Sequence, residues 1–424
     1  MNVLILGGGG REHAIGHKTA QSKNLKNLFF MPGNAGTAAV GKNIPGSPED
    51  FEGVKKQIID YEIDMVIVGP EAPLVAGVTN FIKSDAQIKN TLVIGPEKAA
   101  AQLEGSKDFA KQFMKRHQIP TAAYQTFSAG EYDQAAAFLK TLRPPYVLKA
   151  DGLAAGKGVL IINNYEEACK ELNEMLKGKF GEASGKVVIE EFLNGIELSV
   201  FVLTDGKDYV LLPEAKDYKR IKEGDKGLNT GGMGAVSPVK FADCDFMNKV
   251  KQQIIEPTLT GLMKDKMPYT GFIFFGLMNV NGDPYVIEYN VRMGDPETEV
   301  VLPRIKADLL DLFEGAATGD LVNRKYSHHS DYAVTVMLVS KGYPEAYEKG
   351  KEITGIKEAE QKHLVFHAGT KEENGKVLSN GGRVIAVTGM AGALDDAVSC
   401  AYDGVAQIDF EGVTFRRDIG ADLR

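Results

Sequence analysis

The sequence predicts a multidomain α/β protein that begins with a doubly wound α/β domain. Its 424 residues correspond to about two to four domains at roughly 100–200 residues each. In the first hundred residues, short apolar runs alternate with helical stretches, a pattern typical of a parallel sheet covered by helices on both faces. From about residue 100, short strands and glycine-rich loops follow instead, so a second domain is expected there.

Four short apolar runs predict the strands of the first sheet, and each is followed by glycine or proline. Two stretches between them predict crossover helices. In such a sheet, ligands bind beyond the carboxyl ends of the strands, so the polar residues after each strand are candidate site residues. The predicted strands are residues 3–6, 28–31, 65–68 and 92–94, and the predicted helices are residues 13–21 and 51–61.

The glycines after the first strand raise the question of dinucleotide binding. A dinucleotide fingerprint needs Gly or Ala where this chain has Glu12 or His13, and an acidic residue where it has Pro32. An NAD-dependent dehydrogenase is therefore disfavoured. A phosphate at the start of the first helix, held by backbone N–H groups and Arg11, is expected instead. The alternative is that the glycines only permit close packing of strand and helix.

Composition excludes several function classes. The formal net charge of −8 gives no electrostatic basis for binding nucleic acid. Cys169, Cys244 and Cys400 are far apart and fit neither a zinc site nor a disulfide framework, which favours a reduced, cytoplasmic location. No apolar run reaches the roughly 18 residues that a membrane helix needs.

A loop rich in glycine and lysine lies between two short apolar strands. Its sequence is KADGLAAGKG at residues 149–158. Gly156 and Gly158 let the backbone approach a ligand closely, while Lys149 and Lys157 supply charge, so the loop predicts a polyphosphate site. It is not a P-loop, because the spacing is shorter and a strand follows. The alternative is an ordinary glycine-rich hairpin loop beside surface lysines.

The segment around this loop predicts a small mobile unit. Residues 99–116 predict one helix and residues 119–121 a linker; residues 124–192 then form a subdomain small enough to act as a lid. Within it, residues 166–176 predict a helix with one apolar face. The strand at residues 186–193 ends in an Asn-Gly turn before Glu197, an arrangement that suits an adenine and its ribose, although such glutamates are usually solvated.

The next segment predicts a substrate loop and a metal pair. Residues 216–238 are long, charged and glycine-rich, as functional loops often are. After a helix at residues 243–264, a hairpin places Glu288 and Asn290 on one face of a strand, because side chains alternate. Two neighbouring oxygen ligands suit Mg²⁺ carrying phosphate, and a polar strand edge is the alternative. The residues from about 327 onward predict an α+β unit.

In this order, the phosphate loop, the adenine strand and the metal pair resemble the ATP-grasp fold. Longer runs resemble the phosphoribosylamine–glycine ligase family. These runs are GGREHA at 9–14, GPEAPL at 69–74, LEGSK at 103–107, KADGLAAGKG at 149–158, NTGGMGA at 229–235, GDPET at 294–298 and HAGT at 367–370.

The resemblance implies an architecture and a reaction. The expected domains are an N-terminal α/β substrate domain at 1–102, an ATP-grasp domain at 103–326 with a lid at about 121–190, and a C-terminal α+β domain at 327–424. Glycine, ATP and 5-phosphoribosylamine would give glycinamide ribonucleotide, ADP and phosphate through a glycyl phosphate, in purine biosynthesis. Mg²⁺ or Mn²⁺ is the implied metal, and the protein is expected to be a cytoplasmic monomer without nucleic-acid or membrane partners.

The resemblance also implies roles for individual residues. Catalytic roles fall to Arg292 and Asp217, and metal binding to Glu288 and Asn290. Nucleotide contacts are implied for Lys107, Lys149, Gly156, Lys157, Gly158, Glu190, Glu191, Phe192, Leu193 and Glu197. Substrate contacts are implied for Gly10, Arg11, Glu12 and Glu71, and are expected in the long loop at Asn229, Gly231 and Gly232.

Two rival functions share parts of this pattern. A carboxylase that uses ATP and bicarbonate has the same kind of nucleotide centre, and a nucleotide sensor would bind ATP without releasing phosphate.

The strand before Glu288, residues 271–278, carries no carboxylate. Water, or an acid elsewhere in the chain, would therefore have to complete the ligands of a metal.

Overall fold

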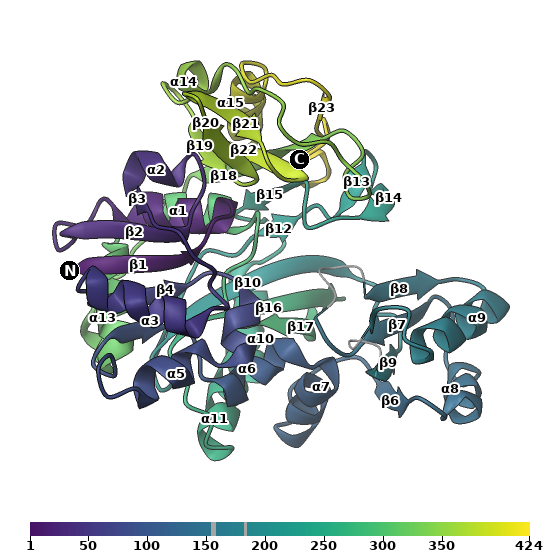
Figure 1. Cartoon of the computed structure of the whole chain (residues 1–424). Coiled ribbons are helices and arrows are strands. Elements are labelled where there is room, and N and C mark those ends of the chain that lie inside the picture. Colours follow the sequence, from purple (N-terminus) through teal and green to yellow (C-terminus); the bar gives the residue numbers. More distant parts are fainter. Residues whose placement is uncertain (154–157, 182–184) are drawn as a thin grey trace.

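A computed structural model describes residues 1–153, 158–181 and 185–424 of the chain. The N-terminal part is a parallel five-stranded sheet in the order β3-β2-β1-β4-β5 (Figure 1). All four strands expected here are confirmed, and the short β3 extends the edge of the sheet. The strands are β1 (Asn2–Gly7), β2 (Asn27–Pro32), β3 (Lys42–Asn43), β4 (Met65–Val68) and β5 (Leu92–Ile94).

Helices cover both faces of this sheet, as the alternating sequence predicts. On β1, Leu4 and Leu6 pack with the helices α3 and α5, whereas Val3 and Ile5 pack with α1 and with the later helix α13. Side chains on a strand alternate between faces, so the fully apolar β1 needs cover on both. The helices of this part are α1 (Gly10–Thr19), α2 (Thr37–Val40), α3 (Phe51–Asp60), α4 (Glu71–Ala76), α5 (Val78–Ser84) and α6 (Lys98–Gly105).

The central part is an antiparallel sheet in the order β11-β10-β16-β17. The expected hairpin around Asn281 and Gly282 is present, with positive φ at both residues, as a tight hairpin turn requires. Its elements are α7 (Lys107–Arg116), β10 (Ile196–Thr204), β11 (Tyr209–Leu211), α10 (Cys244–Val250), a π-helical turn (Lys251–Ile255), α11 (Glu256–Lys264), β16 (Gly271–Val280), β17 (Asp283–Asn290), α12 (Thr298–Arg304), α13 (Leu309–Thr318) and a short 3-10 turn (Leu321–Asn323).

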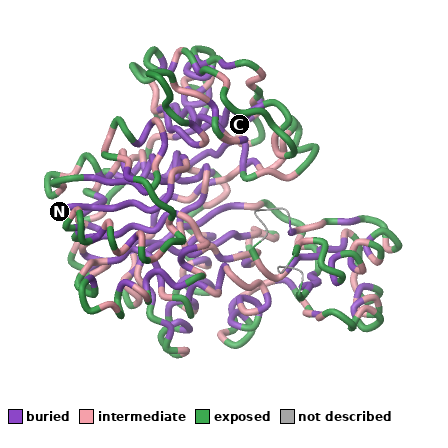
Figure 2. The backbone as a smooth tube through the Cα atoms, viewed as in Figure 1, coloured by how far each residue is buried: buried purple, intermediate pink, exposed green. Residues whose placement is uncertain are grey.

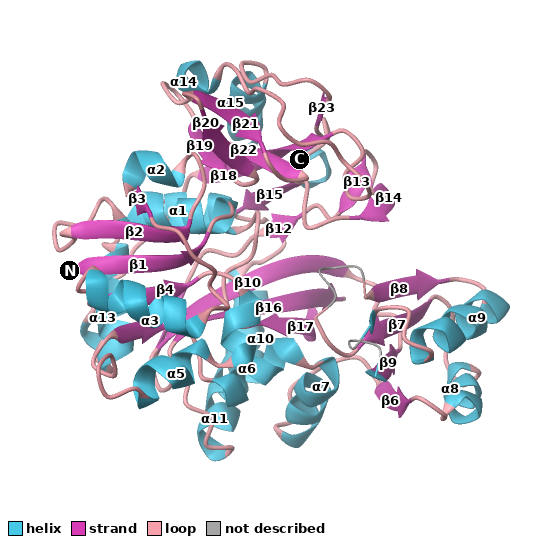
Figure 3. Cartoon of the chain, viewed as in Figure 1, coloured by secondary structure: helices cyan, strands magenta, loops and turns pink. Residues whose placement is uncertain are grey.

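The expected lid is a separate small lobe at one side of the molecule (Figure 3). It has a four-stranded antiparallel sheet in the order β6-β9-β7-β8 and its own apolar core. The helix α9 buries the predicted face, namely Ala168, Leu172, Met175 and Leu176. The lobe comprises β6 (Tyr124–Ser128), α8 (Tyr132–Leu139), β7 (Tyr146–Ala150), β8 (Val159–Ile162), α9 (Tyr165–Leu176) and β9 (Lys186–Glu190).

The C-terminal part packs α15 against a sheet that runs β12-β15-β18-β22-β19, with β23 paired to β18. Two of these strands, β12 and β15, come from the segment expected to be a loop. The elements are β12 (Lys216–Asp217), β13 (Arg220–Lys222), β14 (Lys226–Asn229), β15 (Gly234–Ser237), β18 (Tyr332–Ser340), α14 (Ile356–Ala359), β19 (Leu364–His367), β20 (Thr370–Glu373), β21 (Lys376–Ser379), β22 (Arg383–Ala391), α15 (Leu394–Val405), β23 (Val413–Thr414) and a 3-10 turn (Ala421–Leu423).

Four expectations about local structure were wrong. The strand predicted at residues 186–193 ends at Glu190, and the Asn-Gly turn after it does not close a hairpin, because β9 and β10 belong to different sheets. Residues 216–238 are not a plain loop, because β15 pairs with β18 about a hundred residues later. Residues 99–116 form two helices, because Ser106 is extended and caps α7 by accepting a hydrogen bond from the Phe109 N–H. The first helix begins at Gly10 rather than at residue 13, so the glycines and Arg11 belong partly to the helix itself.

The buried residues follow the strands of the N-terminal and central sheets, whereas the outer helices are exposed on one side (Figure 2). The lid has a thinner buried layer, since it is a single small sheet with two helices. Within the described ranges, no helix is both long and apolar enough to cross a bilayer.

Candidate active site

A cavity of about 690 Å³ lies where the N-terminal, central, lid and C-terminal parts meet. It gathers residues that are far apart in the chain. Twelve of the residues singled out from the sequence line it: Arg11, Glu71, Lys107, Lys149, Gly158, Glu190, Asp217, Asn229, Gly231, Glu288, Asn290 and Arg292. The cavity therefore joins the expected nucleotide, metal and substrate residues in one place.

The lysines at the lid side are held by buried polar contacts. Lys149 Nζ lies 3.0 Å from Glu190 Oε1 and donates to the carbonyl of Ile287 at 3.2 Å. Lys111, one turn after Lys107 on α7, lies 3.0 Å from the other oxygen of Glu190. Burial lowers the pKa of Lys111 to about 8, against the opposing effect of Glu190. The Glu190 carboxylate thus holds two lysines, Lys149 and Lys111.

Lys107 is placed by the start of α7 and by the glycine-rich loop. Asp151 of that loop accepts hydrogen bonds from the Ser106 hydroxyl at 2.9 Å and from the Asp108 N–H at 2.7 Å. The Lys107 ammonium donates to the Gly152 carbonyl at 3.1 Å. These contacts hold the loop against the helix N-terminus and bring Lys107 and Lys149 to one wall of the cavity, where they can bind phosphate oxygens.

Glu288, Tyr289 and Asn290 all line the cavity, but the Tyr289 residue is 2% exposed and its hydroxyl bonds to Thr258 at 2.9 Å. The predicted alternation on β17 is confirmed. Burial would raise the pKa of Glu288, but four surrounding cations lower it below its ordinary value, so the carboxylate is ionised. These cations are Lys219, Lys149, Lys107 and Arg292.

An ionised carboxylate beside an amide oxygen fits Mg²⁺, which commonly binds one or two protein oxygens together with substrate phosphates. Among the described residues, no group of three or more His, Cys, Asp or Glu side chains is arranged to hold a metal. A cage of several carboxylates and imidazoles is therefore not supported among these residues. The residues present fit a metal that carries phosphate and water.

A cluster of partly exposed charged side chains includes two residues that line the cavity, Asp217 and Lys219. Lys219 forms an ion pair with Glu197. Burial lowers the pKa of Lys219, but the carboxylates of Glu197, Asp217 and Glu288 outweigh this effect and raise the pKa well above its ordinary value. Burial raises the pKa of Asp217 to about 8, and the acids Glu297, Glu197 and Glu288 add to the effect. Lys219 was missed from the sequence, although its spacing from Asp217 on an extended segment was a usable signal.

Arg292 is fixed between two carboxylates, those of Glu104 and Glu71. Its Nη2 donates to Glu104 Oε1 at 2.6 Å, and its Nε lies 3.4 Å from Glu71 Oε2. Burial, opposed by Arg292, raises the pKa of Glu104. Although burial opposes it, Arg292 together with Arg11 lowers the pKa of Glu71. Arg292 is thus oriented in advance of any substrate.

The first strand–helix turn is similarly braced. Glu12 accepts from the Gly9 N–H at 2.6 Å and from Arg11 Nε at 2.6 Å, while Arg11 Nη1 donates to the Met293 carbonyl at 3.2 Å. Arg11 lines the cavity beside the N-terminus of α1, a position suited to an anion.

The C-terminal part supplies a wall that no sequence motif indicated. Arg383 donates to the carbonyls of Gly231 at 2.5 Å and Asp295 at 2.6 Å. The Tyr343 hydroxyl accepts from the Gly231 N–H at 2.8 Å. Arg383 and Tyr343 both line the cavity. The C-terminal part therefore contacts the cavity and also holds the segment around Gly231.

The remaining candidates lie near the cavity or outside the described ranges. Within the described part of the chain, seven of them are not among the cavity-lining residues: Gly10, Glu12, Glu191, Phe192, Leu193, Glu197 and Gly232. Of these, Glu12 and Glu197 bind the lining residues Arg11 and Lys219 directly. Gly156 and Lys157 lie outside the described residues.

Family models cover most of the chain. The model of the phosphoribosylglycinamide synthetase N domain matches residues 1–104, that of its ATP-grasp (A) domain residues 105–298, and that of its C domain residues 333–422. The three matches follow one another in the order expected from the sequence motifs.

Relatives match over the whole chain. A phosphoribosylamine–glycine ligase of Chlorobaculum tepidum is 46% identical, and the match covers 99% of both chains. The crystal structure of a phosphoribosylamine–glycine ligase from Thermotoga maritima superimposes with a TM-score of 0.85 at 38% identity, covering 99% of this chain and 100% of that one.

A more distant structure shares the fold alone. The biotin carboxylase domain of Hydrogenobacter thermophilus 2-oxoglutarate carboxylase, in complex with MgADP, ADP and bicarbonate, has a TM-score of 0.70 at 17% identity. That match covers 97% of this chain and 91% of the other. At this identity the match shows a shared fold and carries no conclusion about function.

Proposed function

Because the chain belongs to the phosphoribosylglycinamide synthetase family, we propose that the cavity at the junction of its parts is where it makes glycinamide ribonucleotide. The chain is a phosphoribosylamine–glycine ligase, an ATP-grasp enzyme of de novo purine biosynthesis, and glycine and phosphoribosylamine are its substrates. The family uses ATP, so the cavity has to hold a nucleotide together with both of these substrates.

The observation that carries the assignment is the meeting of three residue groups in one cavity. The lysines Lys107 and Lys149, the oxygen ligands Glu288 and Asn290, and the substrate-side Arg292 all line it. A nucleotide bound along the lid would direct its terminal phosphate toward Glu288 and Arg292. The substrate end then lies against Arg11, the N-terminus of α1 and the Arg383 wall.

We propose that the reaction passes through glycyl phosphate. The glycine carboxylate attacks the γ-phosphorus, a C–O–P link forms, and the bond to the ADP oxygen breaks. The amine of phosphoribosylamine then attacks the acyl carbon, loses a proton, and expels phosphate. Because the carboxylate itself has no good leaving group, phosphorylation is what makes the acyl transfer possible, and the protein mainly positions reactants and neutralises charge.

The side chains divide these tasks by position. Lys107 and Lys149 bind phosphate oxygens, and Arg292, oriented by Glu71 and Glu104, neutralises charge on the acyl phosphate. Lys219 and Asp217 lie where the reacting groups meet, and Asp217, with its raised pKa, is suited to hold or release a proton there. Closure of the lid would exclude the water that otherwise hydrolyses the intermediate.

We propose Mg²⁺, or Mn²⁺ in its place, at Glu288 and Asn290. When bound, the ion supplies charge neutralisation for phosphate oxygens. We also propose that Glu190 to Leu193 line the adenine side and Glu197 the ribose side, and that Gly10, Arg11, Glu12 and Glu71 serve the phosphoribosyl group. The chain is proposed to act as a monomer in the cytoplasm, and sedimentation would test the first of these points.

The deciding experiment measures ADP release with glycine, phosphoribosylamine and ATP, each omitted in turn. Full turnover only with all three supports the assignment. Release of ADP that depends on bicarbonate and is indifferent to glycine would indicate a carboxylase instead, and ATP binding without phosphate release would indicate a nucleotide sensor. Positional isotope exchange in labelled ATP that requires glycine would support the glycyl phosphate.

A further inference from the structure

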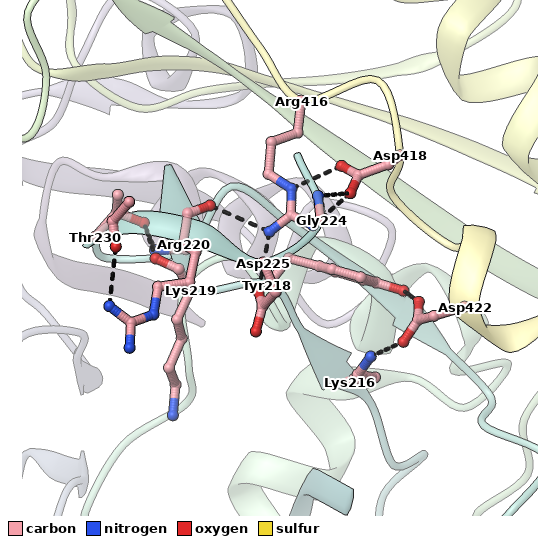
Figure 4. A network of polar contacts seen from close by, with 12 residues as sticks. Lys216, Tyr218, Lys219, Arg220, Gly224, Asp225, Thr230, Arg416, Asp418 and Asp422 are labelled. Atoms are coloured by element: carbon pink, nitrogen blue, oxygen red, sulfur yellow. Dashed lines mark hydrogen bonds and ion pairs between the residues drawn. The ribbon is translucent and has the colours of Figure 1, made fainter. Parts of the chain in front are cut away.

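The segment that carries Asp217 and Lys219 has a second face, turned away from the cavity. It is extended, so neighbouring side chains point to opposite sides. Asp217 and Lys219 line the cavity, whereas Lys216 and Tyr218 contact the end of the chain at Asp422 (Figure 4). The position of the two cavity residues is thus linked to contacts that no substrate touches.

Tyr218 is the centre of these contacts. It is 4% exposed, and its hydroxyl donates to Asp422 Oδ1 at 2.5 Å. The Tyr218 hydroxyl oxygen also accepts a hydrogen bond from the Gly420 N–H at 3.0 Å. Burial raises the pKa of Tyr218 further above its ordinary value, so the phenol keeps its proton and remains a donor. Lys216 forms an ion pair with the same Asp422 and lies 4.6 Å from the centre of the Tyr218 ring.

Arg416 holds the adjoining hairpin. Its guanidinium, with a side chain 3% exposed, binds both oxygens of Asp418 at 2.8 Å and lies 3.2 Å from Asp225. It also donates to the Arg220 carbonyl at 3.1 Å, and Asp418 accepts from the Gly224 N–H at 2.8 Å. The charged groups of residues 416–422 therefore bind both the backbone and the side chains of residues 216–225.

The same segment is fixed on its cavity side by its own backbone. The Lys219 carbonyl accepts from both the N–H and the hydroxyl of Thr230, each at 2.8 Å, and the Tyr218 N–H donates to the Gly234 carbonyl at 3.0 Å. Together with the pairing of β12 to β15, these bonds set the path of the chain and the face that each side chain takes. The Tyr218 side chain and its partners add a restraint from behind the segment.

We propose that residues 416–422 position Asp217 and Lys219 for the reaction, with Tyr218 and Asp422 as the principal positioning residues and Arg416 as support. This inference rests on the proposed function, since it assigns a role to an element behind that site. A shift of about 1 Å at a reacting group can cost on the order of a hundredfold in rate. The remote C-terminal contacts therefore belong to the machinery of turnover, rather than to folding alone.

The test is a double-mutant cycle between Tyr218 and Asp422. Tyr218→Phe keeps the ring and removes the hydroxyl, and Asp422→Ala removes the acceptor. Each is expected to lower kcat at least fivefold while the KM for ATP stays within twofold. The double variant is expected to lose no more than about twice the worse single variant, because both changes remove the contact between Tyr218 and Asp422, and Asp422→Ala also removes the ion pair with Lys216. Asp422→Asn keeps an acceptor for Tyr218 and is expected to restore most of kcat.

The matched control is Asp395→Ala, which removes another carboxylate near the end of the chain. Asp395 is 73% exposed in its side chain and pairs only with Arg424 at 2.8 Å among its ion pairs in the described chain, so activity should stay at the wild-type level. A wild-type kcat in both Tyr218→Phe and Asp422→Ala would overturn the proposal. So would independent, multiplicative losses in the double variant.

A second measurement separates this proposal from the proposed function. Amide hydrogen exchange in residues 216–230 is expected to rise at least tenfold in Tyr218→Phe, whatever reaction the protein catalyses, while exchange in the N-terminal sheet stays unchanged. Unchanged exchange in this segment would refute the positioning role even if the enzyme assay succeeds. Failure of wild-type protein in the omission assay would instead refute the proposed function.

Discussion

Replacing Lys149 by Met removes a buried cation from the lid side of the cavity. Lys149 is 5% exposed and lies 3.0 Å from Glu190, so its ammonium is already oriented before nucleotide binds. Met has a similar length and keeps most of the packing, so the substitution mainly removes charge.

The expected effect on catalysis can be worked from this geometry. Two unit charges about 4 Å apart interact by about 4 kcal/mol at an effective dielectric constant of about 20, and removal of one preorganised group typically costs about 10²- to 10³-fold in kcat. We therefore expect kcat/KM to fall at least about tenfold, or about 1.4 kcal/mol, and on the order of a hundredfold if Lys149 binds the reacting phosphate.

The fold is expected to survive the substitution. Glu190 keeps its 3.0 Å contact with Lys111 after the substitution, so its charge is not left unpaired. The free energy of unfolding should fall by roughly 1–3 kcal/mol, below the roughly 3–5 kcal/mol expected when a buried charge loses its only partner. The variant should therefore be folded when it is assayed.

The assay is ADP release with all three substrates, together with urea unfolding. The matched control is Lys186→Met, in the same lid sheet: Lys186 is 48% exposed in its side chain and pairs with Asp108 at 2.8 Å. The control should keep wild-type kinetics. Unchanged kinetics in folded Lys149→Met, or equal losses in both variants, would remove Lys149 from the site.

Single residues at other places in the fold give three more predictions. Glu288→Ala should raise the Mg²⁺ concentration needed for half-maximal activity at least tenfold, because an ionised ligand is lost; Asp283→Ala on the same strand, which pairs with Lys249, is the control, and an unaltered Mg²⁺ titration would refute the metal assignment. Burial lowers the pKa of His367 from 6.5 to about 4, so on acidification the unfolded state takes up a proton at this residue before the folded state does. The contribution of His367 to the free energy of unfolding is therefore complete above pH 6.5 and falls by about 3 kcal/mol as the pH drops to 4. The pH dependence of the thermal midpoint over this interval should therefore be shallower in His367→Asn, and an equal slope in both proteins would contradict this. Gly232→Ala should lower both thermal stability and activity, because φ at Gly232 is +116° and an added Cβ would lie 2.4 Å from Pro296; Gly319→Ala, also at positive φ but with open space around it, should lower stability by a smaller amount and leave activity unchanged.

The local sequence pattern was sufficient to predict an element wherever the residues of that element by themselves specify its structure. The four predicted strands of the five-stranded first sheet are mostly apolar because both faces of the sheet are covered, and that property is visible in the sequence. The hairpin that carries Glu288 and Asn290 was predictable for the same reason, since Asn281 and Gly282 specify the turn and the alternation of β17 places both side chains on one side. The motifs of the family identified the reaction.

The strands and side-chain contacts that depend on residues far along the chain were set only by the tertiary structure. Residues 216–238 show no strand pattern of their own, because β15 is formed by pairing with β18. The places of Arg383 and Tyr343 in the cavity, and that of Asp422 behind Tyr218, likewise depend on contacts across more than a hundred residues. The sequence by itself determined the local elements, the chemistry and the family. Only the fold determined which charges became neighbours, because burial and distance, which set their pKa values and orientation, are properties of the assembled chain.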